Sequence, residues 1–178
     1  MHETPQDLAR LQAMLDHSYE AAGPHLKVVI TPERRLSAEQ LCERLQGMCL
    51  LVLATVTADG RPINGPLDGF FYRGEWYFGS SDDSLRFRHI RKRPPVSATY
   101  MPAEEFSVST HGRATEIDLA THDEGAFRQT MLDYYVERFG EGAGAMFDSP
   151  GVVYARIEAE RMYTFYLDPA IMDASTTS

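Results

Sequence analysis

The sequence predicts a mainly β fold with helices (α+β), an antiparallel barrel of about six strands with helices at its ends. Three observations lead to this prediction: strand-like runs dominate from about residue 48 onward, short turns separate them, and one helical stretch interrupts them late in the chain. With 178 residues, 43% of them hydrophobic, the chain is long enough for one well-packed domain. We expect a helical extension at 1–35, the barrel domain at 36–168 and a flexible tail at 169–178.

Charge and cysteine content limit the function classes. A formal net charge of −9 argues against general binding to nucleic acid or to anionic membranes, which need a broad basic surface. No apolar run approaches the length of a membrane span, and the N-terminal residues lack the layout of a signal peptide, so we expect a cytoplasmic protein. Cys42 and Cys49 are expected to be reduced core thiols rather than a disulfide or a metal site.

Helical patterns come first along the chain. Leucines at helical spacing predict an amphipathic helix over residues 5–22. Residues 25–30 are expected to form a short extended piece, followed by a connector at 31–35. A second helix is predicted to open at Ser37, because Gln40 follows at the spacing of a capping box.

Strands follow. Residues 48–57 read as a buried strand, 58–60 as a hairpin turn and 62–72 as the returning strand. A third strand is expected at 75–78, ending where Gly79 breaks it.

The second half repeats this pattern around one helix. Strands are expected at 96–100, at 106–117 with a bulge or close backbone approach at Gly112, and as a strand or hairpin at 152–167. Between the last two, a helix is predicted over 121–139, with Thr121 and Glu124 at capping-box spacing, followed by a loop up to Gly151.

A short basic helix after the third strand is the feature that most suggests a ligand. Leu85, Phe87 and Ile90 are expected to face inward, and prolines at 94 and 95 end the helix. The residues expected to stay polar are Arg86, Arg88, His89, Arg91, Lys92 and Arg93.

Five of these residues are Lys or Arg on an otherwise acidic chain, and hydroxyl groups precede the helix N-terminus. Such a pocket suits an anion, so we interpret the segment as a phosphate seat. The alternative is a solvated basic helix, which is what most runs of charge are. Asp82 and Asp83 would repel a phosphate unless they point away or cap the helix.

Three stretches in this order, LATVTADGRPINGPL, WYFGSSDDSLRFRHIRKRPPVSATY and VSTHGRATEI, resemble the flavin-binding split-barrel family that includes the pyridoxamine 5'-phosphate oxidases. The resemblance covers about residues 36–167. It implies a six-stranded split barrel and a homodimer with FMN at the subunit interface. A related branch binds the 8-hydroxy-5-deazaflavin coenzyme instead.

The resemblance also implies a cofactor site. The phosphate would be held by Ser84 and Arg86, where the family has serine and lysine, and the strand at 64–67 would pass along the flavin ring. Arg113 could reach the phosphate or a ring oxygen, or pair across strands with an acidic residue. The candidate cofactor-binding residues are Asn64, Gly65, Pro66, Leu67, Gly79, Ser80, Ser81, Ser84, Leu85, Arg86, Ser107 and Arg113.

These features lead us to expect an FMN-dependent oxidoreductase that transfers hydride between the flavin and a small organic substrate, with no identified catalytic side chain and no metal site. The family's late Arg-x-His pair has no match in Arg161-Met162-Tyr163, which argues against pyridoxamine phosphate as substrate. The alternatives are a deazaflavin-dependent reductase, a flavin- or heme-binding protein without turnover, or a structural dimer whose basic segment contacts an acidic partner.

Other side chains have two interpretations. His111 is a candidate for a heme or substrate contact, or is an ordinary surface histidine. Five aromatic residues could wall a flavin or substrate, although aromatics at such strand positions are usually core. They are Phe70, Phe71, Tyr72, Trp76 and Tyr77.

Overall fold

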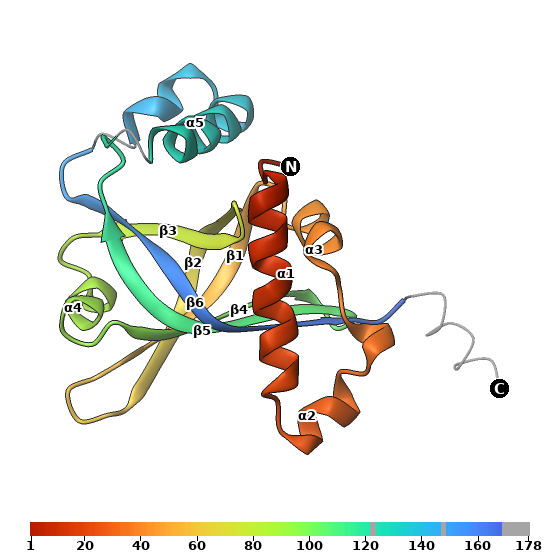
Figure 1. Cartoon of the computed structure of the whole chain (residues 1–178). Helices are drawn as coiled ribbons and strands as arrows, with labels where there is room; N and C mark the ends of the chain where they lie inside the picture. The colour runs from red at the N-terminus through yellow and green to blue at the C-terminus, as the bar shows by residue number, and fades with distance from the viewer. Residues whose placement is uncertain (122–123, 147–148, 169–178) are drawn as a thin grey trace.

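The computed structural model, which describes residues 1–121, 124–146 and 149–168, is a closed barrel of six antiparallel strands in the order β1-β2-β3-β6-β5-β4 (Figure 1). The predicted mainly β barrel with helices is confirmed. The strands are β1 (Met48–Val56), β2 (Pro62–Tyr72), β3 (Glu75–Ser81), β4 (Pro95–Ala103), β5 (Phe106–Ile117) and β6 (Val152–Tyr166). The helices are α1 (Pro5–Glu20), α2 (Pro24–Val29), η1 (Pro32–Arg34), α3 (Ala38–Arg44), α4 (Leu85–Lys92), α5 (Gly125–Phe139) and η2 (Glu141–Met146).

The first hairpin follows the predicted pattern, but β3 is longer than predicted. Gly60 has φ +85° in the turn between β1 and β2, a backbone conformation that favours glycine. The break predicted at Gly79 is wrong, because β3 continues through it to Ser81. Gly79 pairs with Tyr154 on β6, and an added Cβ would lie 2.8 Å from the Tyr154 ring. The glycine therefore makes room for that ring beside the strand instead of ending the strand.

Gly112 forms the bulge expected from the sequence. The register between β5 and β6 shifts between His111 and Gly112, and a Cβ at position 112 would lie 2.1 Å from the Glu158 carbonyl oxygen. Only a residue without a side chain allows the two backbones to approach this closely.

Helices α1 and α3 lie against the barrel, and their N-termini are capped by side chains. Ser37 and Gln40 form the predicted capping box of α3. The extended piece predicted at 25–30 is wrong, since α2 covers most of it. Pro24 occupies the first turn of α2, where proline fits a helix. Part of the expected connector forms η1.

Helix α5 begins later than predicted. The capping box expected from Thr121 and Glu124 is absent in the described structure: the Thr121 hydroxyl donates to the Asp118 carbonyl, and the Glu124 carboxylate accepts a hydrogen bond from Arg156 at 3.2 Å. An ion pair to β6 therefore takes the place of a helix cap. The segment expected to be a loop after α5 contains η2, and the tail predicted at 169–178 lies outside the described residues. Among the described residues, the structure contains no helix both long and apolar enough to span a bilayer.

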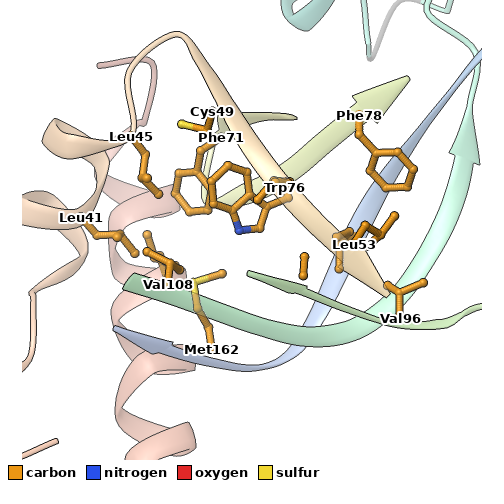
Figure 2. Close-up of a cluster of buried hydrophobic side chains, with 14 of the residues drawn as sticks. Leu41, Leu45, Cys49, Leu53, Phe71, Trp76, Phe78, Val96, Val108 and Met162 are labelled. Atoms are coloured by element: carbon orange, nitrogen blue, oxygen red, sulfur yellow. The ribbon is translucent and has the colours of Figure 1, made fainter. Parts of the chain in front are cut away.

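The main core fills the barrel and extends beneath α1 and α3 (Figure 2). Cys42 and Cys49 are free and buried, as predicted. Burial raises the pKa of the Cys42 thiol to about 12 and that of Cys49 to about 11, so both stay protonated. A second cluster joins α5 to the outer faces of β2 and β3. Its buried members are Phe70, Tyr72, Tyr77, Leu119, Phe127 and Met131.

Candidate functional site

The basic helix α4 is anchored to the barrel by side chains that only partly match the prediction. The Ser84 hydroxyl caps it by accepting a hydrogen bond from the Phe87 amide at 3.2 Å. Phe87 and Ile90 are buried as expected, but Leu85 is 47% exposed. His89, expected to stay polar, is buried, with its Nδ1 2.9 Å from the Thr55 hydroxyl of β1. A helix of eight residues has too few turns for its sequence alone to define the buried face.

Two of the five cations in this segment already have partners. The Arg91 guanidinium pairs with Glu116 at 2.7 Å and with Asp82, so Asp82 neither caps the helix nor stands alone. The Arg93 Nε donates to the Val56 carbonyl at 2.8 Å. The broad positive pocket expected from five cations is therefore reduced.

Arg86 differs from its neighbours, because its half-buried guanidinium faces a cavity. Its Nη2 lies 3.4 Å from the Gly65 carbonyl and 3.3 Å from the Pro66 carbonyl, both long hydrogen bonds. No carboxylate in the described part of the chain forms an ion pair with it, and burial lowers its pKa. The cavity, called here the Arg86 cavity, has a volume of about 210 Å³. Its lining consists of Leu53, Thr55, Ile63, Asn64, Gly65, Ser84, Leu85 and Arg86.

A second cavity, called here the α5 cavity, lies between α5 and strands β2, β3 and β6. Its volume is about 290 Å³. The Tyr135 hydroxyl donates to the Asp68 carboxylate at 3.4 Å, and burial together with that carboxylate raises the pKa of Tyr135. The lining consists of Asp68, Phe70, Phe78, Gly79, Ser80, Ser81, Met131, Tyr135, Val152 and Tyr154.

The structure divides the predicted cofactor-binding residues between these cavities. Five of them line the Arg86 cavity: Asn64, Gly65, Ser84, Leu85 and Arg86. Pro66 contacts Arg86 through its carbonyl, and Leu67 is buried in the core. Three others line the α5 cavity instead: Gly79, Ser80 and Ser81.

Ser107 and Arg113 line neither cavity. On β5, Ser107 lies opposite Phe165 and Arg113 opposite Glu158 of β6. The roles of all these residues in cofactor binding stay predictions.

Several cavity residues were missed by sequence reasoning, among them Asp68, Tyr135 and Tyr154. The contributions of α5 and β6 depend on tertiary packing and have no local signal. Asp68 did have one, because it is the only charged residue within β2.

The other candidate side chains lie in the core, in the cluster beneath α5 or on the surface. Trp76 and Phe71 pack in the core, where the Trp76 indole donates to the Thr110 hydroxyl at 3.2 Å. Tyr72 and Tyr77 belong to the cluster beneath α5, as does Phe70, which also lines the α5 cavity. His111 is exposed on β5 and its Nδ1 lies 2.8 Å from the Ser97 hydroxyl.

An exposed apolar face lies on the outside of the barrel. Leu50 and Val52 of β1 are 58% and 44% exposed, and Met101 of β4 is 66% exposed. Val52 pairs with Thr99, so Met101, two residues further along β4, lies on the Leu50 side of the same face. Large apolar side chains grouped in this way are typical of interaction surfaces.

Comparison with known proteins identifies the fold. The sequence matches no protein-family model, and no curated protein matches it. The structure is similar to the heme storage protein HutZ of Vibrio cholerae, with a TM-score of 0.57 and 18% identity over 76% of this chain and 94% of that one.

Two further solved structures are similar over comparable lengths. A putative pyridoxamine 5'-phosphate oxidase from Listeria innocua has a TM-score of 0.56 and 16% identity, over 71% of this chain and 95% of that one. An FAD-binding protein from Mesorhizobium loti has a TM-score of 0.56 and 21% identity, over 74% and 93%. The chain therefore has the split-barrel fold of the pyridoxamine 5'-phosphate oxidase-like proteins.

Proposed function

We propose that this protein is an FMN-dependent oxidoreductase that transfers hydride between the flavin and a small organic substrate. The observation that carries the proposal is Arg86, a half-buried guanidinium that faces a cavity and pairs with no carboxylate of the described chain. Burying a cation without an anionic partner is unfavourable, so its retention favours an anionic ligand. A flavin mononucleotide carries such a group in its phosphate.

The surroundings of Arg86 suit a phosphate in two further ways. Ser84 lies at the N-terminus of α4 and lines the same cavity, and the N-terminal amides of a helix stabilise anions. The planar guanidinium can donate two parallel hydrogen bonds to phosphate oxygens. The long contacts from Arg86 to two carbonyl groups of β2 would be replaced by stronger, charge-assisted ones.

When bound, FMN supplies the hydride chemistry, while the protein orients the ring and limits access of water. The backbone of β2 next to Arg86 would contact the ring, and the substrate would approach from the open side. A deazaflavin coenzyme that bears a phosphate would use the same seat. An absorbance spectrum of the purified protein separates the two, since the deazaflavin absorbs at shorter wavelength than the yellow FMN.

We further propose that the active form is a homodimer with the cofactor at the interface. The exposed apolar face formed by Leu50, Val52 and Met101 supports this, since a second copy would remove it from water. A cytoplasmic location is consistent with two free, buried thiols.

The proposal is tested by titrating FMN into flavin-free protein and its variants. Arg86→Ala is expected to lower the affinity for FMN about 10- to 100-fold, because one charge-assisted contact to the phosphate is lost. Arg88→Ala, which removes an exposed arginine of the same helix, is the matched control and should keep the wild-type affinity. Riboflavin, which lacks the phosphate, should bind wild type and Arg86→Ala equally.

Equal FMN affinity of Arg86→Ala and wild type would contradict the phosphate seat. Turnover is tested separately, by supplying NADPH to the FMN-loaded protein under anaerobic conditions and following bleaching of the flavin. A protein that binds FMN tightly but is never reduced by nicotinamide or other donors would be a carrier and not an oxidoreductase.

A further inference from the structure

The α5 cavity has the opposite electrostatic character to the Arg86 cavity. None of its ten lining residues is Lys, Arg or His, and the only charged one is Asp68. A phosphate or carboxylate would meet a carboxylate there without any cation to offset it. The ligand class that suits the Arg86 cavity is therefore excluded from this one.

Aromatic rings form much of the α5 cavity. Phe70, Tyr135 and Tyr154 come from three different elements and line the same space. The negative faces of such rings attract cations, and the rings also stack on planar ligands. A volume of about 290 Å³ lies just below the usual range for ligand pockets, roughly 300–1,000 Å³, and suits a single-ring compound.

Two features of the structure maintain this arrangement. The Tyr135 hydroxyl donates to the Asp68 carboxylate, which ties α5 to β2 across the cavity. On the other side, Gly79 allows the Tyr154 ring to lie beside β3, because a Cβ at position 79 would come within 2.8 Å of that ring. The cavity therefore depends on a glycine that the predicted phosphate seat does not explain.

We propose that the α5 cavity binds a small planar aromatic compound that bears a positively charged nitrogen, with Asp68 as the counter-charge and Tyr154 and Phe70 as the ring contacts. The inference does not depend on flavin binding, because no residue that lines the α5 cavity also lines the Arg86 cavity. If the protein is a flavin enzyme, such a compound is the substrate class that this cavity would admit.

The test compares three probes of similar size and different charge in flavin-free protein: benzylamine, which is cationic at neutral pH, neutral benzyl alcohol and anionic benzoate. Binding is measured by NMR titration. Benzylamine is expected to bind about tenfold more tightly than benzyl alcohol, in line with a cation–π contact and one carboxylate, and benzoate more weakly than either. Equal affinities for the three probes would overturn the proposal.

The Asp68→Asn variant keeps the shape of the side chain and removes its charge. In this variant the affinity for benzylamine should fall to within about twofold of the affinity for benzyl alcohol, since only the electrostatic attraction to the cation is removed. Asp133→Asn is the matched control: Asp133 is an exposed carboxylate of α5 that lies outside the cavity and accepts a hydrogen bond from Gln129 at 2.7 Å. A preference for benzylamine that survives in Asp68→Asn, or is lost equally in both variants, would contradict the role of Asp68.

A second variant tests the position of the site. Gly79→Ala should lower the affinity for all three probes, because the added methyl group would displace the Tyr154 ring toward the cavity. Arg86→Ala should leave benzylamine affinity unchanged, which separates this proposal from the phosphate seat. Loss of benzylamine affinity in Arg86→Ala, or direct competition between benzylamine and FMN, would show one shared site and overturn the inference.

Discussion

The Arg86 cavity and the α5 cavity both border β2, yet the helices that cover them pack into different hydrophobic clusters. Helix α4 covers the first and inserts Phe87 and Ile90 into the main core. Helix α5 covers the second and packs through a separate aromatic cluster, to which Phe127 contributes. One cavity contains a cation that pairs with no carboxylate of the described residues, and the other contains a carboxylate.

This difference shows how one strand can serve two opposite charges. Arg86 contacts the carbonyls of Gly65 and Pro66, and Asp68 follows two residues after Pro66, which is roughly 7 Å along a strand. Because the covering helices pack in different clusters, we expect perturbation of one cavity to leave the other intact.

The largest expected effect comes from detaching α5. Phe127 is 1% exposed, and its ring centroid lies 4.1 Å from that of Tyr77. Phe127→Ala should lower the free energy of unfolding by about 3–5 kcal/mol and abolish benzylamine binding, while FMN affinity stays within about twofold of wild type. Denaturant titration and the two ligand titrations measure these effects.

Phe139→Ala is the control on the same helix, because Phe139 is 62% exposed and should contribute little. A parallel loss of FMN and benzylamine affinity in Phe127→Ala would mean that the two cavities form one cooperative unit, and the comparison would fail.

Much of the fold could be predicted because local signals determine it. The apolar run at 48–57 and the glycine turn at 58–60 predict β1 and β2 closely, and the β2 bounds Pro62–Tyr72 are confirmed. The errors lie where a local signal is ambiguous. Gly79 was taken as a break because glycine often ends a strand, whereas the neighbouring Tyr154 ring explains it. Glu124 was taken as a helix cap, but in the fold its ion pair with Arg156 prevails.

The candidate site was less predictable than the fold. Resemblance pointed to Ser84 and Arg86, which do line one cavity together, but it grouped Ser80 and Ser81 with them. The separation depends on how far β3 extends and where α5 packs, and both are tertiary features. The ion pair between Arg91 of α4 and Glu116 of β5 could not be predicted either, because the two residues are distant in sequence.

A smaller effect is expected from pH, and it should be confined to the Arg86 side. Burial, with smaller contributions from Arg93 and Arg88, lowers the pKa of His89, so the folded protein takes up its proton less readily than the unfolded chain. The stability of flavin-free protein should be fully present above about pH 6.5, the ordinary value for histidine, and should decline as the pH falls below it.

Denaturant titrations across this pH range measure the decline in stability. The His89→Gln side chain does not titrate there, so this variant should lack the part of the decline that comes from His89. Flavin-free protein is required because a phosphate also titrates near pH 6. The same pH dependence in wild type and His89→Gln would contradict the assignment to His89.

The smallest expected effect separates capping from ligand binding at Ser84. Ser84→Ala should lower the free energy of unfolding by about 1 kcal/mol, because the Phe87 amide loses its partner. Ser84→Asp should retain that stability, since aspartate caps a helix equally well, but it should bind FMN more weakly than Ser84→Ala does, because a carboxylate at the phosphate seat repels the ligand. Benzylamine affinity should be unchanged in both variants. If Ser84→Asp binds FMN as tightly as wild type, Ser84 caps α4 without contacting a phosphate, and the anion-binding role of the Arg86 cavity rests on Arg86 alone.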